Sequence, residues 1–270
     1  MRPEALPCAG KAGATAFSVD GTGEEAVVLI HGVGMARRVW APQIEALARR
    51  HTVLSYDMLG HGDSDLPAAD VTLARYADQL RELLDALGLA RAHVVGHSMG
   101  ALVALEFALN HPERTRRVVA MNAVFQRSPE QRAAVMARAQ ALHDTDLSDS
   151  VGPTIERWFG RPVPAALARP AAEVEALLRG VQPLGYARTY ALFASSDSVH
   201  AERLPRLEAP ALFLTAEFDA NSSPAMSEAM ARQVPQGTWQ VIAGARHMMG
   251  VTHPAEVNAR LEAFLCDGRQ

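Results

Sequence analysis

Residues 93–100 read His-Val-Val-Gly-His-Ser-Met-Gly, and this stretch decides how the chain is expected to fold. A short apolar strand pattern enters the motif Gly96-His97-Ser98-Met99-Gly100, and a helical pattern leaves it. A strand that turns abruptly into a helix strains its turn residue, and small residues two positions away on either side let the backbone close up. We therefore expect Ser98 at the apex of the turn, with its hydroxyl at the carboxyl edge of a sheet. An ordinary turn serine is the alternative, and the strand-turn-helix setting favours a nucleophile.

Strand and helix patterns alternate along most of the chain, which predicts an α/β fold with a mostly parallel central sheet and helices on both faces. Strand patterns cover 14–19, 26–30, 52–56, 93–95, 117–121, 211–215 and 239–242, and helical patterns cover 39–49, 72–87, 99–110, 225–234 and 254–265. Between 126 and 207 there is helical pattern without a convincing strand. We expect one core domain from 1–125 and 208–270, with 126–207 inserted as a helical lid. A separate helical domain is the alternative, which the resumed strands disfavour.

The composition is that of an ordinary water-soluble globule, with 49% hydrophobic and 21% charged residues among 270. A net charge of −4 without a dense basic run excludes a nucleic-acid binder of the electrostatic kind. No apolar segment approaches the roughly 20 residues that span a bilayer, so no membrane partner is expected. Cys8 and Cys266 show no metal or redox spacing, and no signal-peptide stretch follows residues 1–4, so we expect a cytoplasmic protein. The sequence does not determine the oligomeric state, and a homodimer is one of the options.

A serine hydroxyl needs a base to remove its proton before it attacks. His247 follows the last strand pattern and Asp219 follows the one before it, so both are expected at the sheet edge that carries Ser98. The imidazole would act as the base, and the carboxylate would orient it and stabilise its cation. Glu217 competes for the acid role, but Asp219 lies deeper in the loop. Asn122, after the preceding strand, cannot carry the charge.

The stretch His31-Gly32-Val33-Gly34 follows the first buried strand pattern. Acyl transfer develops a negative oxygen that needs preorganised N–H donors. We assign this role to the backbone amides of Val33 and of Met99, the residue after the nucleophile. A tight strand-to-helix turn without a ligand is the alternative for residues 31–34.

The substrate pocket is expected to draw on the 126–207 insertion and on the loops beside Ser98. The candidates are His31, Gly32, His97, Arg127, Trp158, Phe159 and Arg161. The aromatic side chains would form walls, and the arginine forks suit carboxylates. A solvated helix face is the alternative for each arginine, because acids are interspersed nearly as often. The two histidines also fit packed structural roles.

These motifs together resemble the α/β-hydrolase-fold enzymes along nearly the whole chain. The matching pieces are His31-Gly32, residues 57–64, residues 96–100, Asp219 and His247. Within that group the chain is most similar to 3-oxoadipate enol-lactonases and their neighbours, through residues 156–159, Gly185-Tyr186 and residues 88–112. The resemblance implies a cofactor-free hydrolase with a helical lid, and it does not supply a substrate.

The residues predict a serine hydrolase that cleaves a small carboxylic ester or (enol-)lactone through an acyl-enzyme. The ten histidines show no metal-ligand spacing, and there is no Gly-x-Gly-x-x-Gly cradle for a dinucleotide, so neither a metal nor a cofactor is expected. The same triad would also suit an amide hydrolase of a small carboxylated metabolite, and the scaffold a carbon–carbon hydrolase or perhydrolase. A binding module that has lost turnover is a further alternative of a different class.

Overall fold

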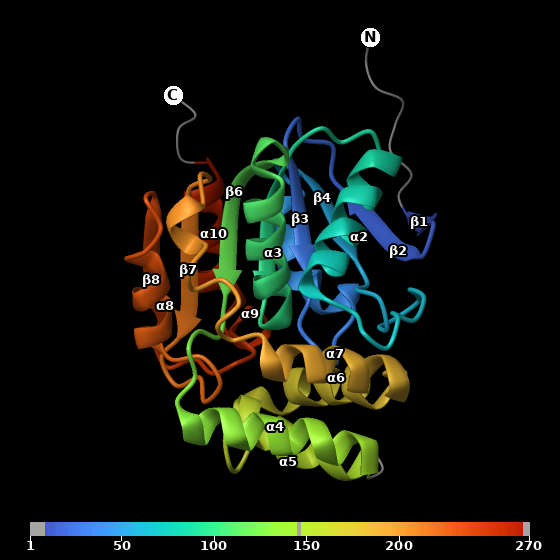
Figure 1. Cartoon of the computed structure of the whole chain (residues 1–270), viewed down its shortest axis with the longest axis vertical. Helices are drawn as coiled ribbons and strands as arrows, with labels where there is room; N and C mark the ends of the chain where they lie inside the picture. Colours follow the sequence, from blue (N-terminus) through green and yellow to red (C-terminus); the bar gives the residue numbers. More distant parts are fainter. Residues whose placement is uncertain (1–8, 145–146, 267–270) are drawn as a thin grey trace.

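The computed structural model describes residues 9–144 and 147–266, and within them eight strands form one sheet (Figure 1). The strand order is β1-β2-β4-β3-β5-β6-β7-β8. β1 and β2 run antiparallel to their neighbours, and all other pairs are parallel. The bounds are β1 Ala9–Ala12, β2 Thr15–Asp20, β3 Ala26–Ile30, β4 Thr52–Tyr56, β5 Ala92–His97, β6 Thr115–Met121, β7 Ala211–Ala216 and β8 Gly237–Ile242. The expected mostly parallel sheet is confirmed.

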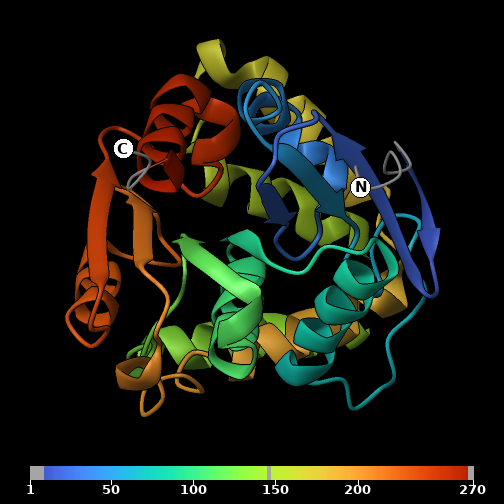
Figure 2. The same ribbon diagram turned by 90° about the horizontal axis from the view of Figure 1, so that it is seen from above.

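Helices cover both faces of the sheet, as the view from above shows (Figure 2). One face carries α2 (Leu73–Ala86), α3 (Met99–Asn110) and α8 (Pro224–Ala231), and the other carries α1 (Ala41–Leu47) and α10 (Pro254–Cys266). Alternate residues of β3 serve the two layers: Val28 and Ile30 pack with the α2 and α3 side, and Val27 and Leu29 with the α10 side. A strand buried on both faces must be apolar throughout, which explains the continuous run at 26–30.

Four further helices lie beyond the carboxyl ends of the parallel strands (Figure 1). They are α4 (Pro129–Asp144), α5 (Leu147–Phe159), α6 (Ala168–Arg179) and α7 (Pro183–Ser195), and we refer to them as the cap helices. α4 packs along α7, and α5 packs along α6. The described part of 126–207 contains no strand, in agreement with its sequence pattern. The cap helices therefore cover the sheet edge at which the candidate site residues were expected.

Two details differ from the sequence prediction. β1 was not anticipated, because its residues are mostly exposed and show no apolar period; it is held by pairing with β2 and by an ion pair between Lys11 and Asp65 at 2.6 Å. The helix expected at 39–49 begins as a 3-10 turn, η1 (Arg37–Trp40), and α1 starts only at Ala41, with a proline in its first turn. Short turns complete the chain: η2 Pro112–Arg114, η3 Ala165–Leu167, η4 Leu204–Arg206 and α9 Met249–Thr252. None of the helices in the described segments is long and apolar enough to cross a bilayer.

Candidate active site

Ser98 lies at the sharp turn between β5 and α3, with φ 55° and ψ −117°. This left-handed backbone is uncommon for a residue with a side chain and costs about 1–3 kcal/mol. A methyl group on Gly96 would overlap the Gly100 carbonyl, and one on Gly100 would overlap the Ile30 carbonyl. The two glycines are therefore required by close backbone approach, as the motif predicts. The turn places Ser98 at the carboxyl edge of the sheet, which the cap helices cover.

His247 and Asp219 meet after β8 and β7, where His247 Nδ1 lies 2.7 Å from Asp219 Oδ2. The same Oδ2 accepts hydrogen bonds from Ser222 Oγ and from Asn122 Nδ2, both at 2.6 Å, and Oδ1 accepts from the Asn221 amide at 2.8 Å. Burial works to raise the pKa of Asp219, but His247, the Ser222 hydroxyl and the Asn221 amide outweigh it and lower that pKa to about 2. An ionised carboxylate requires the proton on Nδ1 of His247, which leaves Nε2 as the basic nitrogen.

The competing acid Glu217 lies elsewhere, because its exposed carboxylate accepts from the Gly244 amide at 2.8 Å. Asn122 has a function that the sequence did not reveal. It could not serve as the acid, but its amide supplies one of the hydrogen bonds that fix Asp219. Asn122 is fully buried at φ 51°, a backbone region in which asparagine is enriched. That enrichment is the signal that could have identified it.

Ser98 and His247 line the same cavity, which has a volume of about 20 Å³ and is called here the Ser98 cavity. Its other lining residues are Val33, Arg157, Trp158, Tyr186, Tyr190, Phe193 and Asn221. Among the hydrogen bonds of the described residues, none joins Ser98 to His247, and such contacts often tighten only in the substrate complex. A space of this size accommodates about one water molecule. A substrate therefore requires the cap helices or the lining side chains to move.

Two backbone N–H groups beside Ser98 have no hydrogen-bond acceptor among the described residues. Within residues 9–144 and 147–266, the amides of Val33 and Met99 donate to no acceptor, whereas the neighbouring Gly34 amide donates to His61 Nε2 at 3.0 Å. A Cβ built on Gly32 would lie 3.1 Å from the Ser98 Cβ, so the loop at 31–34 packs directly against the serine. Their assignment as oxyanion donors stays a prediction from the sequence.

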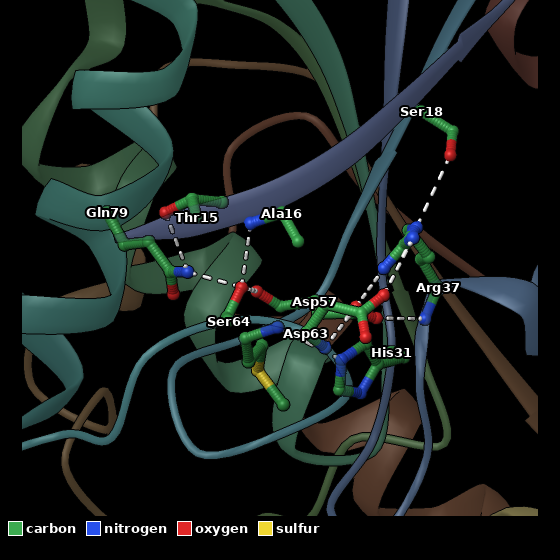
Figure 3. A network of polar contacts seen from close by, with 10 residues as sticks. Thr15, Ala16, Ser18, His31, Arg37, Asp57, Asp63, Ser64 and Gln79 are labelled. Carbon is green, nitrogen blue, oxygen red and sulfur yellow. Dashed lines mark hydrogen bonds and ion pairs between the residues drawn. The ribbon is translucent and has the colours of Figure 1, made fainter. Parts of the chain in front are cut away.

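A buried polar network holds this loop in place (Figure 3). The Asp57 carboxylate accepts from the Arg37 amide at 2.7 Å and from the Arg37 guanidinium. His31 Nε2 accepts from the Met58 amide at 3.0 Å, and its Nδ1 lies 2.8 Å from the Gly32 carbonyl. Burial lowers the pKa of His31 to about 4, so the ring is neutral at pH 7, with its proton on Nδ1. His31 therefore ties the loop after β3 to the loop after β4 and does not line the Ser98 cavity.

Several other residues expected in the substrate pocket also lie outside the Ser98 cavity. The Arg127 guanidinium stacks over Phe193, with its central carbon 4.6 Å from the ring centroid. The backbone amide of Arg127 donates to the Asp197 carboxylate. The Arg161 side chain is 84% exposed and pairs with a glutamate. Phe159 is buried in the core. His97 Nε2 lies 2.8 Å from the His247 carbonyl, and His97 is not among the residues that line the Ser98 cavity.

Trp158 does line the Ser98 cavity, with its ring centroid 5.4 Å from that of His247. Arg157 and Tyr186 were missed as lining residues, although they stand in the motifs 156–159 and 185–186. Tyr190, one turn beyond Tyr186 on α7, was missed as well. Within the described part of the chain, no group of three or more His, Cys, Asp or Glu side chains forms a metal site.

The strained serine turn, the Asp–His pair and the strand order together define an α/β-hydrolase fold. A model of the alpha/beta hydrolase fold matches residues 25–254, and the chain belongs to this family. The (E)-2-((N-methylformamido)methylene)succinate hydrolase of Acinetobacter baylyi is 38% identical over 241 residues, which cover 89% of this chain and 90% of that protein. Membership of this family supports the prediction that the protein is a hydrolase.

Solved structures agree with this fold. An enol-lactonase from Burkholderia xenovorans LB400 has a TM-score of 0.86 at 24% identity, covering 96% of this chain and 100% of that one. A thermophilic esterase from Thermogutta terrifontis, solved with malate bound, has a TM-score of 0.83 at 28% identity, covering 93% of this chain and 92% of that one. The resemblance noted in the sequence is confirmed: an enol-lactonase is among the structures that share the fold.

Proposed function

We propose that the protein hydrolyses a small carboxylic ester or lactone through an acyl-enzyme on Ser98, with His247 as the base and Asp219 as its acid partner. The observation that carries this proposal is the 2.7 Å contact of His247 with an ionised, buried Asp219, beside a cavity shared with Ser98. The geometry leaves His247 Nε2 free to take a proton. The free amides of Val33 and Met99 support the assignment of the oxyanion site.

The proposed reaction has two halves. Ser98 Oγ attacks the carbonyl carbon while His247 Nε2 takes its proton, and the carbonyl oxygen gains the negative charge that the Val33 and Met99 amides stabilise. The intermediate collapses, the bond to the leaving group breaks, and His247 returns the proton to that group. Water then attacks the acyl-enzyme with His247 again as base, which releases the acid and restores Ser98.

We also propose that the cap helices act as a lid over this site. The small volume of the Ser98 cavity, about 20 Å³, and its lining by residues of α5 and α7 support this role. Opening of the cap would admit the substrate, and closure would exclude water from the reacting groups.

The test uses 4-nitrophenyl hexanoate as substrate and a fluorophosphonate as a probe of the nucleophile. Ser98→Ala should lower kcat by a factor on the order of 10⁶ and abolish labelling, by analogy with triad knockouts. Ser195→Ala, which changes an exposed serine of α7, should retain both properties. Turnover within tenfold of wild type in Ser98→Ala would reject the mechanism. Absence of labelling and turnover in the wild type would favour a binding module.

Amide hydrolysis is the second candidate, because the relative with 38% identity is named for a substrate that carries an N-methylformamido group. The same Ser98 chemistry would apply, with His247 protonating the departing nitrogen. Comparing kcat/KM for matched 4-nitroanilides and 4-nitrophenyl esters measures the preference for the bond. An anilide rate within about tenfold of the ester rate would favour the amide candidate, since activated esters are intrinsically far more reactive.

A further inference from the structure

A second cavity lies next to the Ser98 cavity inside the cap. Its volume is about 150 Å³, and it shares Arg157, Tyr186 and Tyr190 with the Ser98 cavity. Arg138 from α4 lines its other side. We refer to it as the arginine cavity. Because three residues line both spaces, a molecule held at Ser98 can extend past them into the arginine cavity once the cap opens.

The two guanidinium groups of this cavity differ from most of the other cap arginines. Arg188 on α7 lies outside the cavity and donates to the Pro67 carbonyl. Arg127, Arg132, Arg161, Arg169 and Arg179 each pair with an aspartate or glutamate. Among the side chains that the structure describes, no carboxylate pairs with Arg138 or Arg157. Arg138 Nε donates to Tyr190 Oη at 3.1 Å, and Arg157 Nη2 donates to Thr154 Oγ1 at 3.0 Å. These direct acceptors are neutral, and the charge of Asp219, which His247 already contacts, acts on Arg157 without a direct ion pair.

Arg157 also retains an unused donor, since its Nε is buried without a hydrogen-bond partner in the described chain. Burial, and then the neighbouring charge of Arg138, lower the pKa of Arg157. Two half-buried cations beside each other are unfavourable unless an anion compensates them. A carboxylate offers two acceptor oxygens that match guanidinium forks. A cavity of 150 Å³, about five water volumes, has room for a carboxylate with a short chain.

We propose that the arginine cavity binds a carboxylate group of the substrate, held between Arg138 and Arg157 and remote from the carbonyl that Ser98 attacks. This rests on the proposed function, because Ser98 defines where the scissile bond lies. The substrate class is then a carboxylic acid derivative with a free acid group separated by a short chain from its reactive acyl group. Arg157 lines both cavities and would contact both the acid group and the chain that leads to the reactive acyl group, whereas Arg138 would contact only the acid group.

The test compares pairs of 4-nitrophenyl esters with equal chain length, one acidic and one neutral. The acidic members are the mono esters of glutaric, adipic and pimelic acid, and the neutral members are the pentanoate, hexanoate and heptanoate. The measured quantity is the ratio of kcat/KM for the acidic ester to that for the neutral ester. We expect the wild type to favour at least one acidic ester, and Arg138→Gln to lower that ratio by roughly 10- to 100-fold, in line with loss of a charged hydrogen bond. Arg138→Lys should restore part of the ratio.

Arg169→Gln is the matched control, since it removes an equal charge from an exposed position of α6 and should leave the ratio unchanged. The acidic esters carry their acid group on the acyl half, so they do not test a substrate that carries it on the leaving group. Free glutarate and adipate, measured as inhibitors of 4-nitrophenyl hexanoate hydrolysis, test the anion site in either case. Their inhibition constants should rise about tenfold or more in Arg138→Gln. If neither the ratio nor the inhibition constants respond to Arg138→Gln, the anion site is wrong. Turnover of the neutral ester that persists in Ser98→Ala would instead overturn the proposed function.

Discussion

Asp219 shows how much of the site is set by single hydrogen bonds. Its Oδ2 accepts from His247, Ser222 and Asn122, and all three donor distances are 2.6–2.7 Å. One oxygen with three donors is held in a single orientation, so the imidazole that it contacts is also fixed. Ser222 and Asn122 therefore position Asp219 without contacting the space in which a substrate would react.

Replacing Ser222 by Ala tests this positioning role. The change removes one donor to an ionised carboxylate, worth about 1.5–3 kcal/mol, so kcat/KM should fall by roughly tenfold while KM changes little. The fall should be much smaller than the factor of about 10⁴ expected for Asp219→Asn, which alters the tautomer of the histidine. Ser227→Ala is the control: this serine is also buried, and its hydroxyl has no hydrogen-bond partner in the described chain. Equal activity of Ser222→Ala and Ser227→Ala would contradict the role.

At the scale of elements, the sequence predicts what depends on local pattern. The apolar run at 26–30 and the serine turn at 96–100 were predictable because burial on both faces and close backbone approach restrict the residue types. β1 was not, because an exposed edge strand carries no apolar period. The residues that line the cavities were predicted least well. Arg127 and Arg157 both belong to the 126–207 insertion, and the sequence alone does not distinguish their roles. The packing of the cap does: Arg127 stacks on Phe193 and pairs with Asp197, whereas Arg157 lines the Ser98 cavity.

The two ends of the cap are joined at Asp197, which follows α7. Its carboxylate accepts from the Arg127 amide at 2.8 Å and from Arg132 Nη2 at 2.9 Å, and its carbonyl accepts from the Gln126 amide at 2.8 Å. The chain therefore enters and leaves the cap at one fully buried acid. This junction fixes where the cap sits, because both of its connections to the sheet pass through it.

Asp197→Ala should loosen the cap while the sheet stays folded. Removing one partner of a buried ion pair costs about 3–5 kcal/mol, so tryptic cleavage within 126–207 should become at least tenfold faster. Limited proteolysis followed by mass spectrometry measures the rate and the sites. Glu173→Gln, which breaks only an exposed pair with Arg169 on α6, should cleave at the wild-type rate. Unchanged cleavage in Asp197→Ala would show that the junction does not hold the cap.

At the scale of the whole molecule, four buried histidines make stability depend on pH. Burial is the main cause that lowers the pKa of His31 and His93 to about 4 and of His61 and His97 to about 3. An unfolded histidine has a pKa of about 6.5, so between these values the unfolded chain binds more protons than the folded chain. Stability is therefore fully present above pH 6.5 and decreases as the pH falls toward 4. Carboxylates with a lowered pKa, such as Asp219, lose their contribution only below about pH 4.5.

Urea unfolding at pH 7.5, 6.0 and 5.0 isolates the histidine contribution, because the carboxylates stay ionised over this range. The free energy of unfolding should fall by up to about 1.4 kcal/mol per pH unit for each histidine that only the unfolded chain protonates. His61→Gln supplies the control within the same molecule: His61 Nε2 accepts from the Gly34 amide, and a glutamine oxygen can accept in its place without titrating. The variant should have the same free energy of unfolding as the wild type at pH 7.5. Between pH 7.5 and 5.0 that free energy should fall less than in the wild type, and the difference is the contribution of one histidine. Parallel pH dependences in the two proteins would mean that the neutral ring of His61 is not what couples the loop at 31–34 to pH.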